Sequence, residues 1–170
     1  MKAGIIGLLL IGAGVFSAKF IQSMKPASPP LFDVPSNWKE IDLGHFLFYI
    51  PPDMKPESVQ GFDSDVWQYS NSSIILNIDW GQYPGAFKPY RGRPEYKEEW
   101  IEINGKTAHF WSYHYSEEYI TAAIGDKRYN ATICFADTGI GEQKLTLRAY
   151  CKTNSDQQTA KIIFQSIRFK

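Results

Sequence analysis

Three aspartates are the side chains best placed to do chemistry in this chain: Asp63, Asp65 and Asp79. We expect them to gather where two neighbouring strands run out into loops. A carboxylate near apolar side chains is costly unless it accepts hydrogen bonds or pairs with a cation. Arg91 and Arg93, in the following loop, are candidate cations for such a pair. We therefore predict a charged corner, which either caps loop N–H groups or forms the edge of a binding surface.

Aromatic side chains follow this corner, with Trp80, Tyr83 and Tyr90 close to the two arginines in sequence. Tyr, Trp and Arg are the residues that most often dominate binding energy at protein interfaces. The same aromatics could instead pack over the core, or stack on a small molecule or glycan beside Asp63 and Asp79. A flat exposed patch would favour a protein partner, and a deep pocket would favour a small ligand.

Patterns typical of catalysis or metal binding do not appear. The histidines are His45, His109 and His114. His109 and His114 are five residues apart in a predicted strand, so they should face opposite sides. The sequence contains neither a G-x-S-x-G nucleophile turn nor a glycine-rich phosphate loop outside its N-terminal segment. We expect no enzymatic activity, no cofactor and no bound metal.

Charge and composition limit the class of protein further. Eighteen Lys and Arg residues balance 18 Asp and Glu residues, which leaves no basic excess to bind nucleic acid. A hydrophobic content of 44% predicts a folded chain. Its length of 170 residues is room for one domain, which we expect to be a monomer.

Residues 1–18 have the layout of a secretory signal peptide, with Lys2, an uncharged apolar stretch and then Lys19. The best cleavage position follows Ser17. An uncleaved anchor helix is the alternative, although the stretch is shorter than the roughly 20 residues that span a bilayer. Both interpretations place the domain outside the cytosol, with membrane contact only through residues 1–18 if they are not cleaved. Residues 19–36 are a proline-rich tether and residues 37–170 the globular domain.

Cys134 and Cys151 are an even pair in a chain expected to be exported, which favours a disulfide. They lie on the two arms of the last predicted hairpin, where both could face the same side. Direct pairing requires a long loop centred on Gly141 to Gln143. A tighter turn at Gly139 to Gly141 would move the two cysteines apart.

The elements that must position these residues are mostly strands, judged from alternating or continuous apolar runs bounded by turn residues. The expected strands are 45–50, 66–70, 74–79, 100–103, 106–115, 119–124, 128–136 and 144–151. A turn at Asn71-Ser72 would pair positions whose numbers sum to 143, so that Asp65 falls on the apolar face. Residues 84–99 are expected to be a long loop.

The last element differs from the rest, because Ala160, Ile163, Phe164 and Ile167 recur at helical spacing. Ser155 and Gln158 form a capping-box pattern, which predicts a helix over 156–166. The predicted fold class is α+β: an antiparallel meander sheet with a C-terminal helix packed on one face.

Several short patterns occur in a fixed order: a strand ending in Pro51-Pro52, GFDS (61–64), IDWG (78–81), a meander, and a closing helix with SIRF (166–169). Over about residues 45–169 this layout resembles the PsbP-like α/β/α sandwich domains of exported bacterial proteins. The resemblance implies a binding or assembly factor without catalysis. This chain departs from that layout in having more strand than helix after residue 99.

These observations predict a non-catalytic, exported interaction domain that binds a protein partner in the cell envelope or outside the cell, as an assembly or immunity-type factor. The alternative is a small-molecule or glycan binding domain with an aromatic and acidic cleft. The predicted binding residues are Asp63, Asp65, Asp79, Trp80, Tyr83, Tyr90, Arg91 and Arg93.

Overall fold

The computed structural model of the protein describes residues 33–82, 91–117 and 121–170. The elements, in chain order, are β1 (Lys39–Asp42), β2 (Phe46–Ile50), β3 (Lys55–Glu57), β4 (Asp65–Ser70), β5 (Ile74–Gly81), β6 (Lys97–Ile103), β7 (Lys106–His114), β8 (Tyr129–Phe135), β9 (Lys144–Cys151), α1 (Asn154–Gln165) and β10 (Arg168–Phe169). Among these described residues, no helix is long and apolar enough to cross a membrane.

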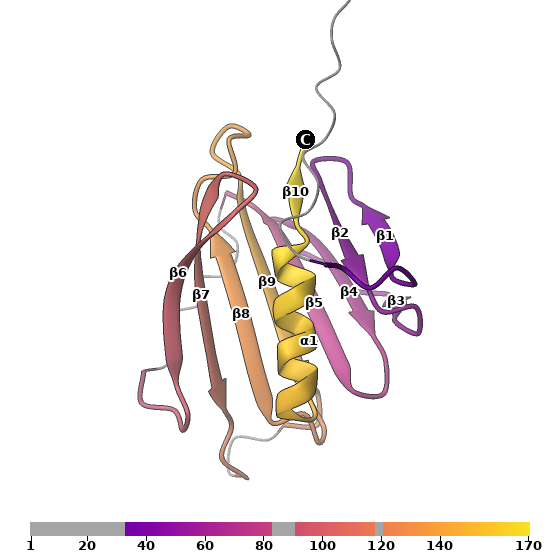
Figure 1. Ribbon diagram of the computed structural model, residues 1–170, viewed down its shortest axis with the longest axis vertical. Coiled ribbons are helices and arrows are strands. Elements are labelled where there is room, and N and C mark those ends of the chain that lie inside the picture. Colours follow the sequence, from indigo (N-terminus) through magenta and orange to yellow (C-terminus); the bar gives the residue numbers. More distant parts are fainter. Residues whose placement is uncertain (1–32, 83–90, 118–120) are drawn as a thin grey trace, which may run out of the picture.

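Two layers make up the fold (Figure 1). One is a seven-stranded antiparallel sheet in the order β3-β4-β5-β9-β8-β7-β6. The other consists of α1 and a three-stranded sheet, β1-β2-β10. The predicted α+β class, with a C-terminal helix on one face of an antiparallel sheet, is confirmed.

The core lies between these layers, where alternate side chains of each strand are buried. On β5 the buried positions include Ile74, Leu76 and Ile78, and their partners on β9 are equally buried. Phe46 and Phe48 on β2 cover them from the small sheet. We call the face of the large sheet that carries α1 the inner face, and the opposite one the outer face.

Helix α1 begins two residues earlier than the sequence predicts. Its N-cap is Thr153, which forms a capping box with Asp156 in place of the expected Ser155 and Gln158. Its apolar stripe, which includes Ala160, Ile163 and Phe164, is buried as predicted and packs mainly on β8 and β9.

The β4–β5 hairpin differs from the predicted register by two residues. Its turn is centred on Ser72-Ser73, and the Asn71 side-chain oxygen accepts hydrogen bonds from the Ser73 and Ile74 N–H groups. Partner positions therefore sum to 145, as in Tyr69 with Leu76. Because a shift by two residues preserves the alternation, every side chain stays on its predicted face.

Two further expectations are corrected. The strand expected over 119–124 is wrong for residues 121–124, which belong to no strand and lead into a turn that includes Gly125, with a φ of 58°. The predicted loop 84–99 ends earlier than expected, because β6 already begins at Lys97. The short strands β1, β3 and β10 were not predicted, since they are too short to show a period.

The predicted disulfide is also wrong, because Cys134 and Cys151 are both free. In the β8–β9 ladder Cys134 pairs with Thr146, five positions from Cys151. That offset corresponds to about 16 Å along the strand, far beyond the roughly 7 Å that a disulfide allows between Cα atoms. An odd offset also places the two thiols on opposite faces. The turn is the tighter of the two considered, with Gly139 and Gly141 at positive φ.

Candidate functional site

Trp80 lies at the base of a cleft at the end of the β4–β5 hairpin. Its side chain is only 4% exposed, and its ring stacks on His45 with centroids 5.2 Å apart. The Phe46 ring covers another part of the Trp80 ring, with centroids 5.4 Å apart. Of the alternatives expected for Trp80, the structure shows packing on the core, and its ring supports the cleft from below.

This corner cleft has a volume of about 860 Å³. It is lined by His45, Phe62, Asp63, Ser64, Asp65, Trp80, Gly81, Gln82 and Gln143. Asp63 and Asp65 are thus brought together as predicted. Asp65 pairs with Trp80 in the strand register, yet it is exposed, so its carboxylate avoids the cost of burial beside apolar side chains.

Phe62 projects from the same corner with its side chain fully exposed, at 103% of the reference area. It lies in a tight turn that only glycine permits. A Cβ on Gly61 would lie 2.2 Å from the Ser64 carbonyl oxygen, and one on Gly81 would lie 2.8 Å from the Ser64 Cβ. These close approaches fix the segment 61–64 against the end of β5.

Asp79 does not belong to this cleft, although the sequence placed it with the other two aspartates. Its neighbours Ile78 and Trp80 point into the core, so Asp79 points to the outer face. There it lines a pocket of about 340 Å³, the sheet-face pocket. The pocket is lined by Val59, Val66, Trp67, Asn77, Ile78, Asp79, Thr146, Arg148 and Tyr150.

Neither predicted arginine reaches the corner cleft. Arg91 binds both carboxylate oxygens of Glu98, through Nε and a terminal nitrogen at 3.0 Å each. The Tyr96 hydroxyl and the His109 ring also contact that carboxylate. The Arg91 guanidinium is the main reason that the pKa of Glu98 falls to about 2. Arg93 lies over the Tyr115 ring, 5.6 Å from its centroid. Tyr83 and Tyr90 lie outside the described residues.

Trp100 is a second exposed aromatic that sequence reasoning did not select. It is 68% exposed on β6 and stacks on His109 across the strand pair, with centroids 4.4 Å apart. Alternation within KEEWIEI places it on the same outer face as Glu98 and Glu102. That alternation was available in the sequence, as was Phe62 next to Gly61 in the GFDS turn.

In the described part of the chain, titratable side chains form no cluster that could bind a metal ion. No group of three or more His, Cys, Asp or Glu residues is placed there to hold a metal ion. His109 and His114 occupy opposite faces of β7, as their spacing predicted.

No protein-family model matches the chain, and no curated protein matches it either. The resemblance to PsbP-like domains therefore stays a prediction. The geometry itself offers a broad cleft with two carboxylates and one projecting aromatic ring, which is suited to contacts with a cationic surface that has an apolar socket.

Proposed function

We propose that this protein is an exported, non-catalytic interaction domain, and that a protein partner docks on the corner cleft with Phe62 as the central contact. The observation that carries the proposal is the full exposure of Phe62 on a sterically fixed turn. Burying a Phe side chain at an interface contributes about 1.5–3 kcal/mol. Because close approaches at Gly61 and Gly81 constrain the backbone that carries the ring, little backbone freedom is lost on binding.

Charge around Phe62 supports the choice of partner surface. Asp63 and Asp65 flank it, and neither carboxylate forms an ion pair with any residue in the described ranges. A partner with an apolar socket surrounded by Lys or Arg would complement both features. Such flanking charges mainly accelerate association and select the partner, while the aromatic contact slows dissociation.

A protein partner fits this cleft better than a small ligand does. Sites for small molecules are mostly apolar and enclose the ligand. The corner cleft is instead lined largely by polar and charged side chains, and its main apolar surface at the base, Trp80, is only 4% exposed. The apolar group here projects outward, as a contact residue would. The layout of residues 1–18 supports an extracytoplasmic location.

Site-specific photocrosslinking tests the proposal even though the identity of the partner is open. A photoreactive phenylalanine analogue at position 62 of the full chain, expressed in its native host, should give one discrete protein adduct that mass spectrometry identifies. The same analogue at exposed Ser155, which follows β9 at the opposite end of the sheet, is the matched control. Equal adducts at both positions, or none at position 62, would overturn the proposal.

Binding of a small molecule or glycan is the second candidate, and the sheet-face pocket favours it. Val59, Val66 and Tyr150 supply apolar surface there, while Asp79 and Arg148 supply opposite charges. A ligand screen by thermal shift, repeated on Asp79→Asn, tests this candidate. A hit whose stabilisation disappears in the variant would support it, and a hit unaffected by the variant would exclude this pocket.

A further inference from the structure

Strand β6 is an edge strand that could accept another strand. It is last in the order of the seven-stranded sheet, and no described strand pairs with its outer side (Figure 1). The opposite edge, β3, is only 3 residues long and has Pro56 at its centre, which protects it from pairing. By contrast, β6 is 7 residues long and contains no proline.

The hairpin turn determines which backbone groups of β6 point outward. Asn104 and Gly105 have φ values of 51° and 73°, as in a two-residue type I′ turn. In such a hairpin Ile103 and Lys106 exchange both hydrogen bonds, and every second residue of β6 repeats this pairing with β7. The N–H and C=O groups of Glu98, Trp100 and Glu102 therefore face away from β7.

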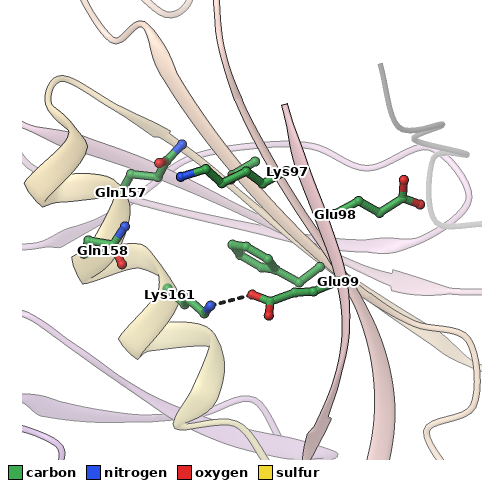
Figure 2. Close-up of a pocket in the computed structure, with 8 residues that line it drawn as sticks. Lys97, Glu98, Glu99, Gln157, Gln158 and Lys161 are labelled. Atoms are coloured by element: carbon green, nitrogen blue, oxygen red, sulfur yellow. Dashed lines mark hydrogen bonds and ion pairs between the residues drawn. The ribbon is translucent and has the colours of Figure 1, made fainter. Parts of the chain in front are cut away.

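A groove of about 290 Å³ runs beside this edge on the inner face, between β6 and α1 (Figure 2). Phe110, which is 5% exposed, forms its base. Gln157, Gln158 and Lys161 line it from α1, and Lys97, Glu98 and Glu99 line it from β6. Lys161 reaches across the groove and forms an ion pair with Glu99, with its Nζ 2.5 Å from the Glu99 Oε1. Glu98 points away from the groove in Figure 2.

We propose that β6 binds an extended peptide segment of alternating charge as an additional strand of the sheet. In an added strand, alternate side chains face the two sides of the sheet. Peptide side chains on the groove side meet Lys97, Lys161 and the two glutamine amides. Glu99 is the one carboxylate whose side chain faces the groove, so acidic peptide side chains fit there. Peptide side chains toward the outer face meet Trp100 and Glu102, so basic side chains fit there.

A second copy of this chain is a poorer occupant of the same edge. Antiparallel pairing of two β6 strands centred on Trp100 would place Glu98 opposite Glu102 at both ends. Like charges directly opposite each other destabilise a strand pair. The charge pattern of β6 therefore favours a different segment, one that alternates acidic and basic residues.

Binding of a synthetic peptide to the full chain tests this site. The probe is a fluorescent peptide as long as β6, 7 residues, in which Glu alternates with Arg. Its control has the same composition with the Glu and Arg residues in blocks, so the total charge is equal but the two faces are not. Fluorescence anisotropy should detect binding of the alternating peptide and at least about tenfold weaker binding of the blocked one.

Variants at Glu102 separate backbone pairing from surface charge. Glu102→Pro removes an outward N–H without removing a hydrogen bond to β7, and should weaken binding at least about tenfold relative to Glu102→Ala. Lys161→Ala, on the helix, is a second variant that leaves the strand intact and should weaken binding as well. Phe62→Ala, at the far edge of the sheet, should leave the peptide affinity unchanged, so this result is independent of the corner cleft.

Three results would overturn the proposal. Equal binding of both peptides would show general charge attraction, and equal binding by Glu102→Pro and Glu102→Ala would exclude strand addition. A dimer of the chain that Glu102→Pro dissociates would show that a second copy occupies the edge.

Discussion

His45 and Trp80 stack face to face, with their ring centroids 5.2 Å apart and their planes inclined by 10°. His45 precedes β2 of the small sheet, and Trp80 lies on β5 of the large sheet. The pair therefore joins the two layers directly below the corner cleft. The stacked pair thus forms the base of the cleft from which Phe62 projects.

Trp80→Ala should destabilise the fold by about 3–5 kcal/mol, because it removes a large buried ring and leaves a cavity. Urea unfolding followed by circular dichroism measures this loss. Trp100→Ala is the matched control: Trp100 is 68% exposed, and its removal should change stability by no more than about 0.5 kcal/mol. Similar stability losses in both variants would contradict the assignment of Trp80 to the core.

Gly61→Ala should disturb the turn that carries Phe62, because its Cβ would lie 2.2 Å from a backbone oxygen. Backbone atoms cannot move aside as a flexible side chain can, so we expect a lower melting temperature and weaker partner binding. Gly92→Ala meets nothing within 4 Å and serves as the control. Identical melting curves for the two variants would show that the turn tolerates a side chain.

Thiol titration checks the correction of the predicted disulfide. The denatured, unreduced protein should show two reactive thiols, because Cys134 and Cys151 are both free. In the native protein Cys134 should react first, since it is partly exposed. Cys151 is fully buried, and burial raises the pKa of its thiol, so it should react only as fast as the protein unfolds. If no thiol reacted after denaturation, the two cysteines would form a disulfide and the correction would be wrong.

We expect the ion pair of Glu98 to be lost in acid, which lowers the free energy of unfolding. The pKa of Glu98 is about 2 in the folded protein and 4.5 for an unperturbed carboxyl. A group with a lowered pKa stabilises the fold above its unfolded pKa, and this stabilisation is lost as the pH falls from about 4.5 to about 2. Glu98→Gln should therefore lose less stability than the wild type across that window in urea unfolding. Glu102→Gln, on the same face of the strand, is the control and should lose as much stability between these pH values as the wild type.

The period of two allowed the sequence to predict most of the sheet and its faces. Asp65 fell on the correct face even though the hairpin register was wrong, because the error was two residues. The same period placed Asp79 on the face opposite Asp65. The three aspartates were grouped because they lie where the two strands run out into loops, and the difference in face separates Asp79 from the corner cleft.

Other parts of the site depended on contacts that one sequence does not reveal. Arg91 pairs with Glu98 because β6 begins within the segment that was expected to be a loop. The exposure of Phe62 follows from two close approaches to Ser64, one of them by Gly81 at the far end of the hairpin. Short-range patterns predict turns, but they do not predict which aromatic a turn leaves in solvent.

The affinity of the crosslinked partner for Phe62→Ala tests the central claim most directly. We predict that this variant binds the partner at least about tenfold more weakly while its melting temperature stays unchanged, because the ring contacts only solvent in the free protein. Trp100→Ala, an exposed aromatic at the opposite edge of the sheet, should bind like the wild type. Wild-type affinity in Phe62→Ala, or a loss of affinity that only parallels unfolding, would contradict the account.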